Sequence, residues 1–159
     1  MTRITDLSPL GRVMRRVEAI SDGAPPVDTI ATGFPSLDRA LGGGLRCGDS
    51  VVSGGDIGGG KSALALAFAV RAAQNGHAST FFTGEASTER VIERALALEG
   101  RARIDDIRGG ALDEATRASL GAAAVRLRER MPDVYGLPGA GVDALALELR
   151  SIADAALVI

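Results

Sequence analysis

The segment from residue 55 to residue 62 has the residue types and spacing of a loop that wraps phosphate groups. Its letters, GDIGGGKS, fit the pattern G-x-x-x-x-G-K-[ST] in full. Glycines let backbone N–H groups turn inward around an anion, and a helix that begins after the loop adds the partial positive charge of its N-terminus. In such loops the lysine reaches the β- and γ-phosphates and the serine hydroxyl ligates Mg²⁺. We therefore predict a site for ATP and Mg²⁺, with Ser62 as the metal ligand, formed by Gly55, Asp56, Ile57, Gly58, Gly59, Gly60, Lys61 and Ser62.

Lys61 is the only lysine of the chain, although the chain has 18 basic residues. The composition is biased toward arginine, so the position of the one lysine is informative. A slim ammonium group fits between phosphates, where a wide guanidinium does not. The alternative is an incidental lysine in a glycine-rich turn, and the spacing around Lys61 favours the phosphate-binding interpretation. We therefore predict that Lys61 is a catalytic residue.

Glu85 is the second candidate catalytic residue, because it comes directly after a predicted strand at 79–83. In a parallel sheet, ligands bind at the carboxyl ends of the strands. A carboxylate at that edge is placed to orient or deprotonate a water that attacks the γ-phosphate. The alternatives are an acidic residue on a surface loop, or a second cap for the helix that Ser87 begins.

The elements that must position these residues alternate along the chain. Short apolar strands are predicted at 49–53, 79–83, 133–137 and 155–159, and helices at 61–75, 87–100, 113–131 and 143–153. Ser87, Asp113 and Asp143 are predicted helix caps, and Gly100 is predicted to end the second of these helices. Strands separated by helices of this length predict an α/β fold in which a mostly parallel sheet lies between helices. The arginines at 126, 128 and 130 are most simply a solvated face of the third helix.

Residues 1–28 are predicted to form a separate N-terminal piece, and residues 29–159 a partial ATPase domain. An amphipathic helix is indicated by apolar residues at three- and four-residue intervals, followed by a Pro- and Gly-containing linker at 21–26. The apolar stripe must be covered, either by its own domain or by a neighbouring subunit. The stripe consists of Leu7, Leu10, Val13, Met14, Val17 and Ile20.

The overall composition excludes several classes of protein. The net charge is −2 and the sequence pI is about 5.4, so no global basic field announces nucleic-acid binding. A single cysteine, Cys47, can form no internal disulfide and provides no metal site, which fits a reducing compartment. The chain has neither a secretory leader nor an apolar run long enough for a membrane span. We therefore expect a cytoplasmic protein without a membrane partner.

The segment from Thr32 to Leu45, with TGFPSLD followed by LGGGL, resembles the opening segment of motors of the RecA superfamily. The block from Phe81 to Arg94 resembles the second-strand motif of DnaB-type replicative helicases, in which a Phe-rich strand ends in a catalytic Glu followed by a Ser-capped helix that bears an Arg. The resemblance covers about residues 29–159. It implies a RecA-like P-loop ATPase that couples ATP hydrolysis to movement on single-stranded DNA in replication, as a homo-oligomeric ring such as a hexamer. It also implies that the N-terminal helix docks on the adjacent subunit.

Some residues depart from the DnaB-type pattern. Ile57 stands at a usual Pro, Gly59 at a usual Met, Cys47 at another usual Pro, and Gly84 and Ala86 flank Glu85 in place of Leu and Met. The Gly84-Glu85 pair looks more like recombination ATPases of the RadA type. Two alternatives to the helicase therefore stay open, a RadA- or KaiC-like recombination or remodelling ATPase, and a nucleotide-binding remnant without turnover.

The last residues, 155–159, form an apolar stretch that is typical of a buried central strand. We expect a longer parent protein, of which this chain is the N-terminal part of the motor. The resemblance implies that a Walker B Asp, DNA-binding loops and an arginine finger come after residue 159. For this chain alone we expect weak nucleotide binding and little turnover.

Overall fold

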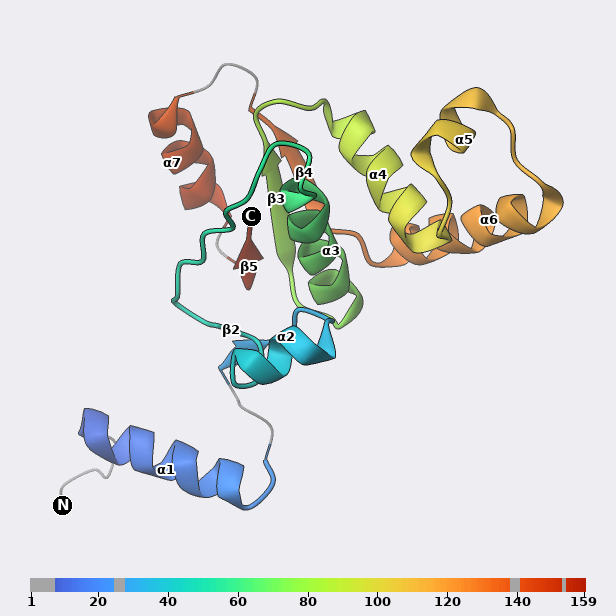
Figure 1. Ribbon diagram of the computed structural model, residues 1–159. Coiled ribbons are helices and arrows are strands. Elements are labelled where there is room, and N and C mark those ends of the chain that lie inside the picture. The colour runs from blue at the N-terminus through green and yellow to red at the C-terminus, as the bar shows by residue number, and fades with distance from the viewer. Residues whose placement is uncertain (1–7, 25–27, 138–140, 153) are drawn as a thin grey trace.

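The computed structural model describes residues 8–24, 28–137, 141–152 and 154–159. Its helices and strands follow one another in an α/β order (Figure 1). In chain order they are α1 (Pro9–Ser21), β1 (Thr29–Ile30), α2 (Pro35–Ala40), β2 (Leu45–Arg46), α3 (Lys61–Gln74), β3 (Ser79–Thr83), α4 (Thr88–Gly100), α5 (Ile104–Gly109), α6 (Glu114–Glu129), β4 (Asp133–Gly136), α7 (Val142–Ser151) and β5 (Leu157–Val158).

The main sheet has three parallel strands in the order β4-β3-β5, and β1 pairs with β2 in a separate antiparallel ribbon. In the main sheet Phe81 is opposite Val134, and Thr80 is opposite Val158. The strand β3 covers the predicted range 79–83, and its side chains are almost all buried. Because β3 lies between two parallel neighbours, its carboxyl end is at the centre of one sheet edge, as predicted for a ligand-binding edge.

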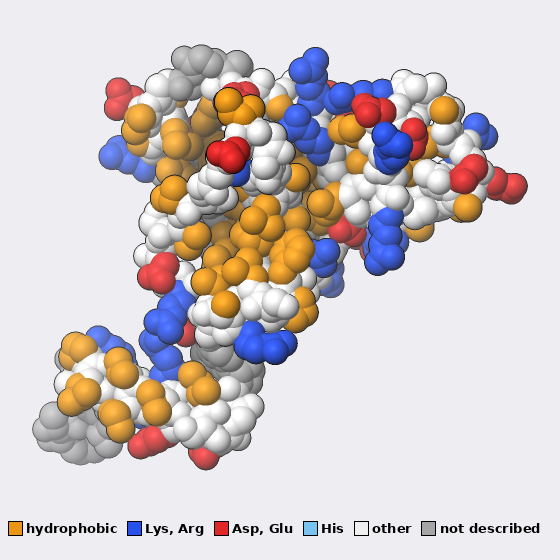
Figure 2. Space-filling model, in the orientation of Figure 1, with side chains coloured by type: hydrophobic (Ala, Val, Ile, Leu, Met, Phe, Trp, Pro, Cys, Tyr) orange, Lys and Arg blue, Asp and Glu red, His pale blue; other side chains and the backbone are white. Residues whose placement is uncertain are grey.

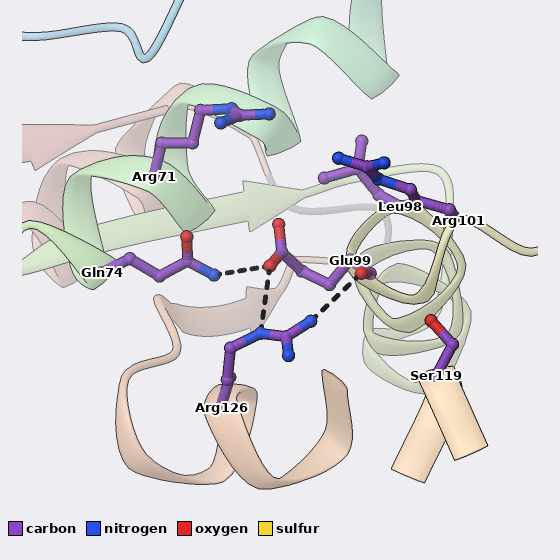
Figure 3. A pocket seen from close by; sticks show the side chains of 7 residues that line it. All are labelled: Arg71, Gln74, Leu98, Glu99, Arg101, Ser119 and Arg126. Atoms are coloured by element: carbon purple, nitrogen blue, oxygen red, sulfur yellow. Dashed lines mark hydrogen bonds and ion pairs between the residues drawn. The ribbon is translucent and has the colours of Figure 1, made fainter. Parts of the chain in front are cut away.

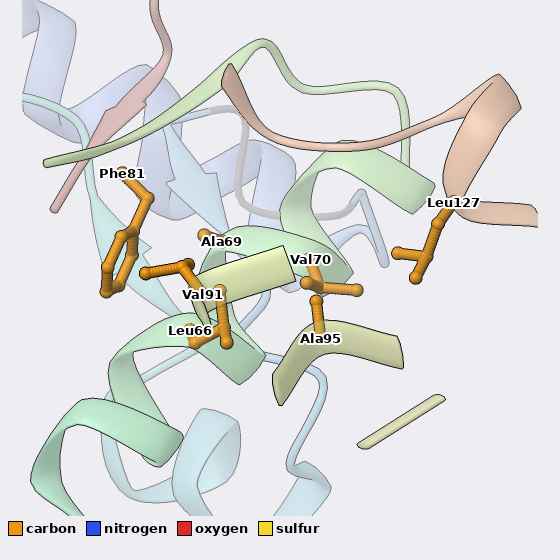
Figure 4. Packing of buried hydrophobic residues seen from close by; sticks show 7 residues of the cluster. All are labelled: Leu66, Ala69, Val70, Phe81, Val91, Ala95 and Leu127. Atoms are coloured by element: carbon orange, nitrogen blue, oxygen red, sulfur yellow. The ribbon is translucent and has the colours of Figure 1, made fainter. Parts of the chain in front are cut away.

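Helices α3, α4 and α6 pack with β3 around one apolar core (Figure 4). In the view of Figure 1, α4, α5 and α6 extend to one side of the sheet and α7 lies on the other. Alanines on α3 and α4 have no exposed surface, so the backbones approach closely. The core cluster consists of Leu66, Ala69, Val70, Phe81, Val91, Ala95 and Leu127.

Two of the predicted helix caps are confirmed and one is wrong. The Ser87 hydroxyl accepts a hydrogen bond from the Arg90 backbone N–H at 3.4 Å, and the Asp113 carboxylate accepts one from the Thr116 N–H at 2.7 Å. The predicted Asp143 cap is wrong, because α7 begins after Gly141 and no side chain caps it. The predicted end of this helix, residue 153, lies outside the described residues.

The predicted strand at 49–53 is wrong for the described structure. Residues 49–56 form no ladder with any described strand, and the side chains of Val51 and Val52 are 63% and 91% exposed. A cavity of about 550 Å³, lined by Val51, Leu64 and Ile159 among others, lies where the segment faces β5. An apolar pair predicts burial only when a neighbouring strand supplies its hydrogen bonds. Here the preceding Gly48, at φ 87°, turns the chain away, and the two glycines after residue 53 offer no side chain for packing.

Helix α1 lies apart from the sheet and its covering helices (Figure 1). Its Arg16 forms an ion pair with Asp28 at 2.8 Å, on the far side of the undescribed residues 25–27. The helix is amphipathic, as predicted, and none of its residues is buried. Leu7 and the two prolines of the predicted linker lie outside the described residues. None of the helices in the described ranges has the length and apolar character needed to cross a membrane.

Candidate nucleotide-binding site

The glycine-rich loop leads directly into α3, which begins at Lys61. Gly58 and Gly60 have φ angles of 79° and 84°, in the left-handed region that favours glycine. Gly60 is the residue before the first helical turn, and no side chain caps the N-terminus of α3. The backbone N–H groups at the start of α3 are therefore available to an anion, and the helix dipole favours negative charge at the same place.

The Lys61 ammonium group lies over the loop and is held by its backbone. Its Nζ atom donates hydrogen bonds to the carbonyl oxygen atoms of Gly55 at 2.9 Å and Asp56 at 2.8 Å. The loop closes on itself where the Gly59 N–H donates to the Asp56 carbonyl at 3.1 Å. The side chain of Ile57 points into solvent. The loop thus presents its glycines and one ammonium group, and the side chain of Ile57 takes no part in this arrangement.

Ser62 and Glu85 line the same cavity, of about 410 Å³, at the carboxyl end of β3. Glu85 is exposed and lies in a tight turn between β3 and α4. The Thr83 hydroxyl fixes this turn, because it donates to the Ala86 carbonyl at 3.0 Å and accepts from the Ala86 N–H at 3.1 Å. Residues 55–61 do not line this cavity, so Ser62 joins the loop to the space that contains the carboxylate.

The residues present fit a magnesium–nucleotide complex. Mg²⁺ takes oxygen ligands and is usually held by one or two protein oxygens together with substrate phosphates. The Ser62 hydroxyl is such an oxygen at the N-terminus of α3. Within the described ranges no three His, Cys, Asp or Glu side chains are grouped to hold a metal by themselves. The donor set therefore suits a metal ion that arrives with phosphate oxygens.

Arg94 also lines the cavity, and it was not among the predicted site residues. It lies on α4, seven residues after Ser87, so two turns of helix bring it back to the face on which Ser87 begins. That spacing from the cap is the signal that could have identified it. A guanidinium in the cavity with Ser62 and Glu85 adds positive charge on the side opposite the loop.

The start of α4 favours negative charge beside Glu85. The pKa of Glu89, in the first turn, is lowered by a hydrogen bond from its own backbone N–H and further by the Ser87 hydroxyl. This effect is the expected one for a carboxylate at a helix N-terminus. Two helix starts, those of α3 and α4, therefore flank the candidate site.

The TGFPSLD segment has a structural explanation. The Asp38 carboxylate accepts hydrogen bonds from both the N–H and the hydroxyl of Thr32, at 2.7 Å each, and Thr32 is buried. Gly33 has a φ of 78°, and a Cβ atom there would overlap Cδ of Arg71. These residues tie the segment before the loop to α3 and do not enter the site.

The fold and the loop together define a RecA-like ATPase domain. The chain belongs to the DnaB-like helicase C terminal domain family, whose model matches residues 29–158. Among solved structures it is similar to a helicase ATPase domain, with a TM-score of 0.76 and 20% identity, over 93% of this chain and 52% of that one. This likeness confirms the predicted fold class.

Curated relatives of the chain include bacterial DNA repair proteins. It is 35% identical over 109 residues to the DNA repair protein RadA of Mycobacterium tuberculosis, which covers 64% of this chain and 23% of that protein. It is 37% identical over 84 residues to the RadA of Escherichia coli, which covers 52% and 18% respectively. The chain thus spans about a quarter or less of the length of these relatives.

Proposed function

We propose that this chain binds ATP with Mg²⁺ and provides half of the active site of a DnaB-like helicase motor, which couples ATP hydrolysis to movement along single-stranded DNA. The observation that carries the proposal is the shared cavity of Ser62 and Glu85 at the carboxyl end of β3. It joins a loop suited to phosphates to a carboxylate suited to an attacking water. Membership of the DnaB-like family adds the movement on DNA. A motor of this kind acts in the cytoplasm.

Each residue of the site has a distinct part in the proposed reaction. The loop N–H groups and the N-terminus of α3 bind the phosphates, and Lys61 neutralises charge on the β- and γ-phosphates. The Ser62 hydroxyl holds Mg²⁺, which when bound stabilises the negative charge that develops on the phosphate oxygens. Glu85 orients the attacking water and accepts its proton. Arg94 faces the same space and adds a positive charge.

We propose that residues 29–159 form the motor part and residues 1–28 an assembly segment. The apolar face of α1 is exposed and turned away from the sheet in the described structure (Figures 1 and 2). A second copy of the chain is the partner that we assign to it, because a ring of identical subunits repeats one contact around its axis. This arrangement agrees with the ring-forming helicases that the sequence resembles.

A RadA-like activity is the second candidate function. The identity of 35% to a DNA repair protein favours it, and the glycine before Glu85 is the residue that the RadA-type pattern has. A DNA-dependent ATPase that separates duplex strands supports the helicase. A DNA-dependent ATPase that leaves duplex strands paired supports the RadA-like activity. Binding without any turnover in the parent protein supports the remnant.

Nucleotide titration of the chain tests the site. A non-hydrolysable ATP analogue with Mg²⁺ is expected to bind, and Lys61→Ala is expected to weaken binding by about tenfold or more, since one charge-assisted contact is worth about 1.5–3 kcal/mol. Arg39→Ala removes one positive charge from the distant helix α2 and serves as the matched control. Equal affinity of the wild type and Lys61→Ala would refute the phosphate-binding assignment.

A further inference from the structure

We propose that the pocket between α3, α4 and α6 binds a phosphate-type oxyanion of a small molecule, at a site separate from the glycine-rich loop. The pocket has a volume of about 430 Å³ (Figure 3). Three arginines line it, one from each helix or its end, and only one carboxylate does. Its polar lining consists of Arg71, Gln74, Glu99, Arg101, Ser119 and Arg126.

The one carboxylate of the pocket is already occupied. The Glu99 Oε2 atom accepts a hydrogen bond from Gln74 Nε2 at 2.8 Å and lies 3.8 Å from Nε of Arg126. Arg126 also donates to the Glu99 carbonyl at 3.2 Å. Glu99 and Arg126 therefore neutralise each other, and the charges of Arg71 and Arg101 are left over.

Arg71 is held in place without a hydrogen-bond acceptor. Its stem packs against Gly33, and its guanidinium lies over the Phe34 ring at 5.1 Å from the centroid. Its Nε atom is buried and has no hydrogen-bond partner among the described residues. A buried polar group normally has a partner, and leaving one unpaired is unfavourable, more so when it is charged. An acceptor in the pocket removes that deficit.

Arg101 takes a backbone conformation that normally belongs to glycine. It caps α4 at φ 53° and ψ 37°, and it is the one non-glycine residue with a positive φ in the described part of the chain. The glycine beside it cannot take this place, because Gly100 is the close-packing position, where a Cβ atom would lie 2.6 Å from Leu120 Cδ2. An arginine in the left-handed region is unfavourable by about 1 kcal/mol relative to glycine. Its side chain makes no hydrogen bond or ion pair within the described ranges, so nothing already present accounts for it.

The two unpaired guanidinium groups point toward one another across the pocket (Figure 3). Like charges that face each other repel, unless an anion lies between them. Guanidinium groups match the oxygens of phosphate in a bidentate geometry, which makes phosphate the oxyanion of choice. The Ser119 hydroxyl is already bonded to the Gly100 carbonyl at 2.9 Å, so the arginines are the donors that remain.

The pocket is distinct from the proposed nucleotide site. Arg71 lies ten residues after Lys61 on α3, which separates them by about 15 Å along the helix axis. A ligand in the pocket contacts the C-terminal end of α3, whereas the loop binds at its N-terminal end. Loss of one site therefore leaves the other testable.

Side-chain NMR of the chain carrying Lys61→Ala tests the pocket with the loop disabled. Inorganic phosphate, pyrophosphate and AMP are titrated at constant ionic strength against sodium chloride, and the Nε–Hε signal of Arg71 is followed. We expect saturable shifts that chloride does not produce, tighter binding for pyrophosphate than for phosphate, and comparable shifts with AMP if a nucleotide can be the source of the phosphate. Shifts that do not saturate, or that chloride reproduces, would overturn the proposal.

Arg101→Gly is the informative variant, because glycine suits the left-handed backbone while the guanidinium is lost. We expect its thermal midpoint to be unchanged or higher and its dissociation constant for pyrophosphate to rise by about tenfold, as the loss of one charge-assisted contact predicts. Arg101→Asn, which also tolerates this conformation, is expected to behave alike. Arg117→Ala, an exposed arginine of α6 outside the pocket, is the control and should retain the wild-type constant. Unchanged binding in both Arg101 variants would refute the site.

Discussion

At the scale of single residues, the candidate site depends on which atoms are free to react. Lys61 is held by loop carbonyls, whereas Glu85 makes no hydrogen bond or ion pair with the described residues and faces a cavity with Ser62 and Arg94. A carboxylate that is fixed by its turn but not by a counter-ion can accept a proton from water. The difference separates a residue that binds phosphate from one that activates the nucleophile.

Glu85→Gln is expected to keep nucleotide binding and to lose ATP hydrolysis, by about a hundredfold or more, because the amide keeps the size of the side chain but accepts no proton. The measurement is steady-state ATP turnover of the parent protein, together with analogue affinity for this chain. Glu89→Gln, one turn further along, is the matched control, since Glu89 does not line the cavity. Wild-type turnover in Glu85→Gln would remove this residue from the mechanism.

The residues of the loop could be predicted because glycine spacing and a lone lysine are sequence properties. The cavity partners could not be predicted in the same way. Arg94 is one of seventeen arginines, and the sequence marks it only by its spacing from Ser87. The sequence favours a solvated helix face for Arg126 and Arg130, yet Arg126 contacts Glu99 and Arg130 donates to the Gln74 carbonyl at 2.9 Å. Long-range partners of this kind depend on the packing of α6 against α3 and α4.

At the scale of elements, local signals succeeded where the hydrogen bonds are local. The cap of α6 involves residues three apart, and the sequence contains both of them. The strand β3 was predicted because five consecutive side chains favour strand and burial. The segment 49–53 has the same kind of letters, but its hydrogen bonds depend on a neighbour that sequence spacing does not reveal.

The cap of α6 predicts a dependence of stability on pH. Hydrogen bonds from the hydroxyl and then the backbone N–H of Thr116 lower the pKa of Asp113 in the folded state. A lowered pKa stabilises the fold above the unfolded value of about 3.9, and this stabilisation disappears as the pH falls through the folded value. Asp113→Ala should therefore lower the thermal midpoint at pH 7 by a few degrees and make little difference near pH 3.

Two companion variants sharpen this measurement. Asp113→Asn keeps a neutral acceptor and should flatten the pH dependence, with little loss at pH 7. Asp143→Ala removes an acid from the first turn of α7 that caps nothing, so it should change the midpoint less than Asp113→Ala does. Equal losses for Asp113→Ala and Asp143→Ala would contradict the assignment of the cap.

At the scale of the whole molecule, α1 is the element without a partner among the described helices. Leu10 is 70% exposed, and the rest of its apolar face, from Val13 to Ile20, is about half exposed (Figure 2). In the described structure one ion pair, from Arg16 to Asp28, links the helix to the chain beyond residue 27. A face of this kind is unfavourable in water and favours association.

Val17→Glu is expected to disrupt self-association, because it places a charge in the centre of the apolar face. Arg15→Gln changes the net charge by the same amount on the opposite face and should leave association unchanged. Sedimentation velocity at several concentrations measures both. A monomeric wild type at every concentration, or equal behaviour of the two variants, would remove α1 from the proposed assembly.

The bonds of Lys61 to the carbonyls of Gly55 and Asp56 have a consequence for selectivity. A phosphate that engages this ammonium must displace both carbonyls, so the loop carries its own competitor. The competitor lowers the affinity of every ligand by the same factor, whatever its base. Only ligands with enough phosphate charge exceed this threshold, and the loop therefore ranks nucleotides by the length of the phosphate chain before any contact with the base is made.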